Sequence, residues 1–141
     1  MLKVLIVDDS LVIRAKMKGF LKKLGHSIVG EAKDGKEAVS LNEKLVPDLI
    51  TMDISMPIMN GVDALKEILK TSNIEDTNII MITANGQDGI VKDALKSGAK
   101  GYILKPVSEC KLQDSIGKIF PEYHNDQSDV LDENELDDML S

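Results

Sequence analysis

The sequence is poor in several kinds of residue, and each scarcity narrows what the chain can be. Its 141 residues include no tryptophan, only two Phe and two Tyr, and a single cysteine, Cys110. One cysteine cannot form an internal disulfide, so we expect a packed or surface thiol without a redox role. Since 43% of the residues are hydrophobic, the core must be built from Val, Ile, Leu and Met. That composition suits a parallel sheet covered by helices.

Long hydrophobic runs and a basic surface are also missing. No apolar stretch of the sequence approaches the roughly 20 residues that span a bilayer, and no signal-peptide pattern opens the chain. Residues 1–120 hold 17 Lys+Arg and 16 Asp+Glu, whereas residues 121–141 hold 8 Asp+Glu and no Lys or Arg. The sequence therefore favours a soluble, cytoplasmic protein with one near-neutral domain, an acidic tail and no nucleic-acid-binding face.

Strand-like and helix-like segments alternate along the chain up to residue 120. The apolar runs predict strands over residues 2–7, 27–31, 49–52, 78–83 and 101–104. Helical periodicity predicts helices over residues 10–24, with Ser10 as a cap, and over residues 36–45, 61–71, 89–97 and 109–120. Five strand–helix repeats call for parallel strands with right-handed crossovers. We therefore expect an α/β fold, a three-layer α/β/α sandwich.

Chemically reactive or charged side chains follow the predicted strands, at the point where each apolar run stops. They are Asp8 and Asp9, Asp53, Thr83, and Lys105 with Pro106. Because the carboxyl ends of parallel strands meet at one edge of a sheet, we expect these residues to share a pocket. Three crowded carboxylates repel one another unless a divalent cation and a nearby lysine offset their charge. The sequence therefore predicts a magnesium-dependent phosphate site.

The carboxylates divide into candidate metal ligands and a candidate nucleophile. Asp9 and Asp53, helped by Asp8 through water and by the backbone carbonyl of Ser55, could supply the oxygen ligands that Mg²⁺ prefers. A carboxylate can also attack phosphorus and form an acyl phosphate, and Asp53 is the candidate for this role. Lys105 would then pair with one phosphoryl oxygen and stabilise its developing charge. Thr83 is not a candidate metal ligand; its hydroxyl would donate a hydrogen bond to another phosphoryl oxygen.

Each of these features has an ordinary structural explanation when it is taken alone. Asp8 and Asp9 could simply begin a helix, where acidic residues are favoured by the helix dipole. Asp53 could be a loop residue, Thr83 a strand-end hydroxyl, and Lys105 part of a turn. Mutually compatible chemistry at four separate strand ends makes the joint coincidence improbable.

Four segments carry a resemblance to a known family. They are VDDS at residues 7–10, MDISMPIMNG at 52–61, ITANGQ at 82–87 and GAKGYILKP at 98–106. Together they resemble the receiver domains of two-component response regulators, over about residues 1–120. The resemblance implies the strand order 2-1-3-4-5 of flavodoxin-like folds. It further implies that Asp53 accepts phosphate from a histidine kinase, with Asp8 and Asp9 as the acidic pair around Mg²⁺.

The same resemblance implies roles for residues around the acceptor. Lys105 would contact the phosphate and would be joined to Pro106 by a cis peptide bond. Thr83 and Tyr102 would form the switch pair that reshapes the surface of the fourth helix, fifth strand and fifth helix. Two further residues would tune the rate of dephosphorylation, and these are Ser55 and Asn85.

The segments around Asp53 and after Thr83 are most similar to stand-alone chemotaxis regulators of the CheY type. This similarity implies a CheA-like kinase and a flagellar switch protein as partners. One alternative is a phosphorelay intermediate that passes phosphate to a histidine phosphotransfer protein. An aspartyl-nucleophile phosphatase is disfavoured because Ser55 stands where such enzymes place an acid, so we expect no enzyme activity beyond self-phosphorylation and slow dephosphorylation. A flavin-binding protein is disfavoured because two aspartates, and no phosphate-binding loop, follow the first strand.

The acidic tail departs from the usual end of a receiver domain. We expect a flexible linker over residues 121–131 and a short amphipathic helix over residues 132–141. Leu136, Met139 and Leu140 share one face of this helix, and together with Leu131 they are the candidate docking residues. Residues 131–140 resemble the amino-terminal peptide of the flagellar switch proteins FliM and FliY. The tail could therefore dock on the face of the fourth and fifth helices and inhibit the domain, or dock on a neighbouring molecule. An acidic tail that only aids solubility is the alternative.

Overall fold

The computed structural model of the chain describes residues 1–71, 76–84 and 88–123. Strands and helices alternate in the order β1 (Lys3–Val7), α1 (Leu11–Lys23), β2 (Ser27–Ala32), α2 (Gly35–Leu45), β3 (Leu49–Asp53), α3 (Gly61–Thr71), β4 (Ile79–Thr83), α4 (Asp88–Ser97), β5 (Gly101–Leu104) and α5 (Glu109–Ile119). A short 3₁₀ helix, η1 (Pro121–Tyr123), follows α5. Every predicted strand and helix is present, with each boundary within one residue of the prediction.

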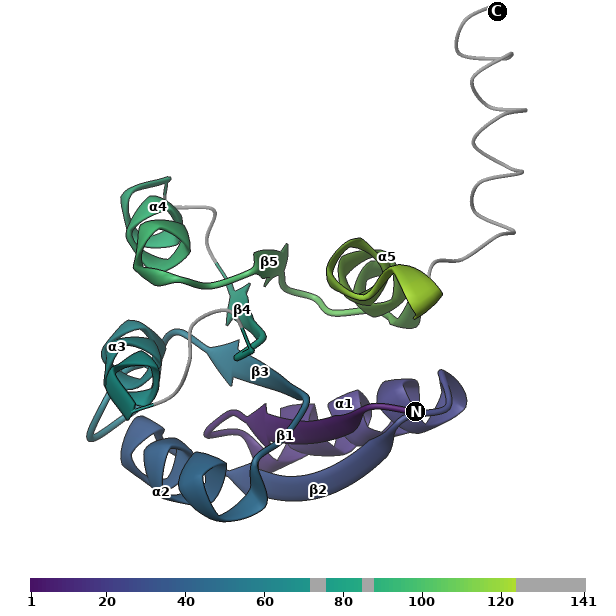
Figure 1. Cartoon of the computed structure of the whole chain (residues 1–141), viewed down its shortest axis with the longest axis horizontal. Coiled ribbons are helices and arrows are strands. Elements are labelled where there is room, and N and C mark those ends of the chain that lie inside the picture. Colours follow the sequence, from purple (N-terminus) through teal and green to yellow (C-terminus); the bar gives the residue numbers. More distant parts are fainter. Residues whose placement is uncertain (72–75, 85–87, 124–141) are drawn as a thin grey trace, which may run out of the picture.

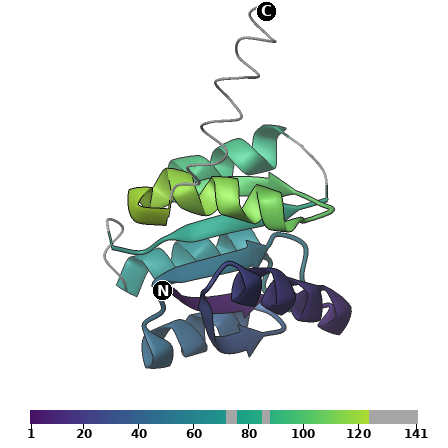
Figure 2. The ribbon, with the colours of Figure 1, turned by 90° about the vertical axis from the view of Figure 1, so that its right-hand side faces the viewer.

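The strands form one parallel sheet in the order β2-β1-β3-β4-β5. Helices α2, α3 and α4 cover one face of the sheet, and α1 and α5 cover the other (Figure 1). Figure 2 looks onto the second face and shows α1 and α5 in front of the strands. The predicted three-layer α/β/α sandwich with the flavodoxin-like strand order is therefore confirmed.

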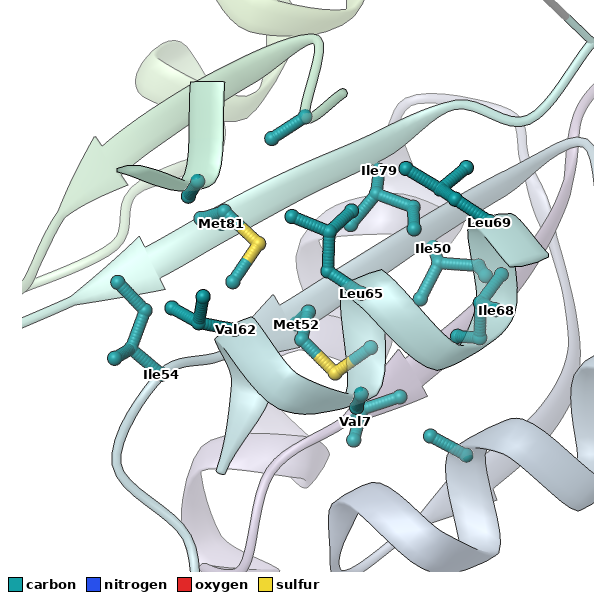
Figure 3. Close-up of a cluster of buried hydrophobic side chains, with 14 of the residues drawn as sticks. Val7, Ile50, Met52, Ile54, Val62, Leu65, Ile68, Leu69, Ile79 and Met81 are labelled. Atoms are coloured by element: carbon teal, nitrogen blue, oxygen red, sulfur yellow. The ribbon is translucent and has the colours of Figure 1, made fainter. Parts of the chain in front are cut away.

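The central strands are apolar on both faces because helices cover both faces. In β4, Ile79 and Met81 join the cluster under α2 and α3, whereas Ile80 and Ile82 join the cluster under α1 and α5. All five residues of β3 and of β4 are buried. Figure 3 shows how the first cluster packs the side chains of these strands against α3. This burial on two sides explains why the strand sequences do not alternate between apolar and polar residues.

Capping side chains determine where several helices begin. The backbone N–H of Ile13 donates to Ser10 Oγ at 3.3 Å, so Ser10 caps α1 as predicted. Asp34 caps α2 and Ser108 caps α5 in the same way. Because β1 ends at Val7 and Ser10 already caps α1, Asp8 and Asp9 are confined to the short turn between strand and helix. Over the described ranges, no helix is both long and apolar enough to cross a membrane.

A short 3₁₀ helix, η1, stands at the start of the segment 121–131 that was expected to be a linker. Pro121–Tyr123 form η1, and the Tyr123 ring meets the His26 ring edge-on, with the centroids 4.9 Å apart. The N-terminal ammonium of Met1 donates to the Tyr123 hydroxyl, and Gln113 Nε2 donates to the Tyr123 carbonyl at 2.5 Å. An aromatic ring with a polar tip can satisfy both an apolar neighbour and a polar one. The rest of the expected linker and the whole expected tail helix lie outside the described residues.

Candidate active site

The carboxyl edge of the sheet carries a cavity of about 690 Å³. Asp9, from the β1–α1 turn, lines it together with Asp53 at the end of β3, Thr83 at the end of β4 and Lys105 after β5. Carboxylate oxygens of Asp8, Asp9 and Asp53 all lie within 4.8 Å of one another. The structure thus places these five side chains, which are far apart in the sequence, around one site.

The charges in this site are buried and unbalanced. Asp8 and Asp53 are each only 3% exposed, whereas Asp9 is exposed. Among the described ion pairs, the only cation that pairs with these carboxylates is Lys105, whose Nζ lies 3.3 Å from Asp53 Oδ1 and 3.6 Å from Asp8 Oδ2. Three carboxylates around one ammonium leave an excess of negative charge at this edge.

The excess charge changes the acid strength of the central carboxyl group. Burial, and then the negative charge of Asp8, raise the pKa of Asp53 to about 6, although the ammonium of Lys105 acts in the opposite direction. The ionised form of Asp53 is therefore destabilised by its surroundings, and a cation that entered the site would stabilise it. Such strongly perturbed groups in a cavity are candidates for function.

The donor set of the site fits a hard divalent cation. The three neighbouring side chains offer carboxylate oxygens only, and Ser55, two residues after Asp53, lines the same cavity. Oxygen ligands favour Mg²⁺, Ca²⁺ or Mn²⁺, whereas zinc and copper sites are typically rich in imidazole or thiolate. The chemistry of this cluster is therefore compatible with the predicted Mg²⁺ site.

The remaining strand ends place a hydroxyl and a lysine beside the carboxylates. Thr83 is 7% exposed, and its backbone carbonyl accepts a hydrogen bond from the Lys105 N–H at 2.7 Å. This bond joins the ends of β4 and β5 and brings both side chains to the cavity. The Lys105–Pro106 peptide bond is cis, as the resemblance implied.

Comparison with known proteins decides the family. Residues 4–117 match the family described as Response regulator receiver domain. The chain belongs to this family. The chemotaxis protein CheY of Thermotoga maritima is 43% identical over 117 residues, which cover 83% of this chain and 96% of that protein.

Solved structures agree with this assignment. A chain in the crystal structure of the CheX–CheY–BeF₃–Mg²⁺ complex from Borrelia burgdorferi is 35% identical and superposes with a TM-score of 0.80, over 84% of this chain and 88% of that chain. The chemotaxis protein CheY4 of Vibrio cholerae is 31% identical with a TM-score of 0.78, over 85% of this chain and 99% of that chain. This chain is thus a CheY-like receiver domain.

Tyr102, which the resemblance pairs with Thr83, is not among the residues that line the acidic cavity. Tyr102 lies on β5 and is 47% exposed; Leu104 on β5 and Ile90 and Leu95 on α4 are also exposed. These four residues are called the α4–β5 patch below. Asn85, which was expected to tune dephosphorylation, lies outside the described residues.

No pattern in the sequence pointed to Arg14, which supports the acidic turn of the receiver from α1. Its Nη1 donates to the carbonyl of Asp8 at 2.6 Å, and its Nε donates to Glu31 Oε1 at 3.0 Å. Lys18 Nζ binds the other oxygen of Glu31 at 2.9 Å. The two cations hold the pKa of Glu31 below its usual value, with Lys18 as the larger cause. Arg14 therefore ties the turn that carries Asp8 and Asp9 to both α1 and β2.

We expect Arg14→Ala to weaken Mg²⁺ binding about five- to tenfold. The hydrogen bond from the charged guanidinium to the Asp8 carbonyl is worth about 1.5–3 kcal/mol, and part of this free energy orders the acidic turn that holds the metal ligands. The measurement is a Mg²⁺ titration followed by the NMR shifts of backbone amides around the site. Lys18→Ala is the matched control, since it also removes a Glu31 partner but does not contact Asp8. Equal Mg²⁺ affinities for the two variants would exclude a positioning role for Arg14.

Proposed function

We propose that this chain is a stand-alone response regulator in which Asp53 accepts a phosphoryl group from a histidine kinase of chemotaxis signalling. The observation that carries the proposal is the position of Asp53, a buried carboxylate 3.3 Å from Lys105 Nζ at the edge of an acidic cavity. The relatives named CheY support the chemotaxis assignment. A CheA-like kinase is the proposed donor, and the cytoplasm is the proposed location.

The side chains around Asp53 suit phosphoryl transfer to a carboxylate. An Asp53 oxygen forms a bond to phosphorus as the bond from phosphorus to the donor histidine nitrogen breaks, and the product is an acyl phosphate. Asp9 and Asp53, with Asp8 and the Ser55 carbonyl, would hold Mg²⁺, which supplies positive charge beside the phosphoryl oxygens. Lys105, directly after β5, would stabilise the negative charge of the same oxygens. Catalysis of this kind needs mainly positioning and charge stabilisation.

The proposed output is a change on the α4–β5 patch. Thr83 ends β4 at the cavity, and Tyr102 projects from the adjacent strand β5 into solvent. A hydrogen bond from Thr83 to the phosphoryl group would shift the end of β4 and favour a different orientation of Tyr102. The patch is apolar enough to bind a partner such as a flagellar switch protein. Ser55 and Asn85 remain the proposed determinants of how fast the phosphate is lost.

We expect Tyr102→Ala to leave phosphorylation unchanged and to weaken partner binding about tenfold, since it removes the largest side chain of the α4–β5 patch. Binding is measured by fluorescence polarisation of a labelled FliM amino-terminal peptide, with the protein activated by beryllofluoride and Mg²⁺. Tyr102→Phe, which keeps the ring, is the control and should retain most of the affinity. An unchanged affinity in Tyr102→Ala would remove this residue from the switch.

The acidic tail has a proposed role of its own. Residues 131–140 resemble the peptide that flagellar switch proteins present, so the tail is proposed to dock on this domain or on a second copy of it. Leu131, Leu136, Met139 and Leu140 would make the apolar contacts. All four lie outside the described residues.

The experiment that tests the acceptor role is intact-mass spectrometry after incubation with acetyl phosphate or phosphoramidate and Mg²⁺. Wild type should gain about 80 Da as an acyl phosphate that hydroxylamine removes, and Asp53→Asn should gain nothing. Asp63→Asn is the matched control, because Asp63 is an exposed carboxylate that lines the same cavity. Absence of any gain in folded wild type with either donor would overturn the proposal.

A further inference from the structure

A second cavity, of about 360 Å³, lies beside α1, one of the two helices that cover the second face of the sheet. We call it the α1 groove. One wall comes from α1 and the other from the residues that follow β5. Its apolar lining residues are Ile13, Met17, Phe20, Pro106 and Val107. It is therefore an apolar groove on a helix face that a chain segment with apolar side chains could fill.

The α1 groove adjoins the acidic site but is not part of it. Ala84 and Lys105 line both cavities. Lys111 Nζ, at the start of α5, lies 3.0 Å from the Pro106 carbonyl, at the wall that follows β5. An occupant of the groove would thus lie beside Lys105, which the groove shares with the acidic site.

The helix that forms the groove is strongly basic. Helix α1 carries Arg14, Lys16, Lys18, Lys22 and Lys23 and no acidic residue. In the part of the chain that the structure describes, the single carboxylate of Glu31 pairs with two of these five cationic groups, those of Arg14 and Lys18, and so offsets only one of their two charges. Lys16 lines the groove and is exposed. The charge around the groove therefore favours an acidic occupant.

The course of the chain after α5 supplies such an occupant. The Tyr123 ring contacts His26, which lies between α1 and β2, so the described chain ends on the side of α5 that faces α1. Residues 124–141 then contain 7 Asp+Glu, no Lys or Arg, and the apolar residues Val130, Leu131, Leu136, Met139 and Leu140. Acidic charge and aliphatic side chains together are what a basic, apolar groove would select.

We propose that residues 131–140 of the same chain occupy the α1 groove. Leu136 and Met139 fill its apolar floor, and the neighbouring aspartates and glutamates lie near Lys16. This proposal rests on the self-docking of the tail proposed above, but it places the tail on the α1 groove instead of the face of α4 and α5. It does not depend on phosphorylation. The occupant would place negative charge beside Lys105, which lines both cavities.

The chain length permits docking within one molecule. Leu131 lies eight residues after Tyr123, so an extended connection spans up to about 26 Å. Helix α1 has 13 residues and is therefore about 20 Å long. Every part of the groove is within reach, and tethering over such a distance gives an effective concentration in the millimolar range. Weak intrinsic affinity is thus sufficient for substantial occupancy.

The test is paramagnetic relaxation in the full-length, unphosphorylated protein. A nitroxide is attached at Ser141→Cys in a Cys110→Ser background, and methyl spectra are recorded at low protein concentration. The signals of Ile13, Met17 and Val107 should lose most of their intensity, whereas those of Ile90 and Leu95 should not. Because no phosphate is involved, a failure of the acceptor proposal leaves this result unaffected.

Matched variants separate specific docking from general attraction. Leu136→Asp with Met139→Asp should restore the groove signals, while Asn125→Asp with Gln127→Asp adds the same charge and should leave the broadening in place. Lys16→Glu should also restore the signals, and Lys22→Glu, on the same helix, should not.

Four outcomes would overturn the proposal. Broadening centred on Ile90 and Leu95 would place the tail on the α4–β5 patch. Broadening that appears only when labelled and isotope-enriched molecules are mixed would make the occupant a second copy. If the broadening seen in wild type persisted in the Leu136→Asp, Met139→Asp variant, the tail would be attracted by charge alone and would not dock specifically. No broadening on any face would mean that the tail does not dock.

Discussion

In metal-free buffer at a pH of about 7.5, Asp53→Asn should raise the free energy of unfolding by about 2–3 kcal/mol. The carboxyl group is almost fully buried beside Asp8, and these surroundings raise its pKa from 3.8 to about 6. Keeping this group ionised at neutral pH therefore costs stability, and the neutral amide removes that cost while retaining the size of the side chain. The measurement is urea unfolding with EDTA, followed by circular dichroism.

The pH dependence of this effect has a definite sign. Between the unfolded pKa near 3.8 and the folded pKa of about 6, the folded state binds more protons at Asp53 than the unfolded state does. The stability contributed by this group therefore falls as the pH rises through that window and stays at its lowest value above it. The advantage of Asp53→Asn should be small at a pH of about 4 and complete by a pH of about 7.

His26 also titrates in this pH range, so the test compares the free energy of unfolding of wild type with that of Asp53→Asn at each pH. Burial, and then the charge of the N-terminus, lower the pKa of His26, so this group costs stability as the pH falls below its unfolded pKa of 6.5. His26 is present in both proteins, so its contribution cancels in the difference between them. Mg²⁺ should stabilise wild type more than the variant, because only wild type retains the third carboxylate. A variant that is less stable than wild type in EDTA would contradict the account of the buried charge.

The fold and the acidic cluster could be predicted from the sequence because they depend on the local hydrophobic pattern and on the order of the strands. Apolar runs without alternation predict buried parallel strands, and the residue after each run must then lie at the carboxyl edge. The Ser10 cap was likewise predictable from the hydroxyl that precedes an apolar periodic segment.

Other features could not be predicted because they depend on how distant elements pack. The contact of Arg14 with the Asp8 carbonyl requires α1 to cross β2 at one particular position, where Glu31 holds the guanidinium. Tyr123 is held by contacts with His26 and with the N-terminal ammonium, and both of these groups are remote from it in sequence. The α1 groove depends on two elements separated by most of the domain.

Gly61→Ala should lower the free energy of unfolding by about 2–3 kcal/mol and slow phosphorylation of Asp53 tenfold or more. A Cβ at residue 61 would lie 2.2 Å from the Asp53 carbonyl oxygen and 2.9 Å from both the Asp53 carbonyl carbon and Ile54 Cα. All three atoms belong to the backbone, so no side chain can move aside. The Gly61 N–H also donates to the Ile54 carbonyl at 2.8 Å, which holds the two segments together.

The expected loss of rate follows from the same contact. Backbone displacement at Asp53 changes the 3.3 Å distance between its Oδ1 and Lys105 Nζ, and small displacements of a nucleophile are costly in transfer reactions. Gly19→Ala in α1 is the matched control, because a Cβ there meets no atom within 4 Å. Alanine at that position should stabilise the helix by about 0.5–1 kcal/mol and leave phosphorylation unchanged. If Gly61→Ala were as stable and as quickly phosphorylated as wild type, the β3–α3 connection would not be what fixes the position of Asp53.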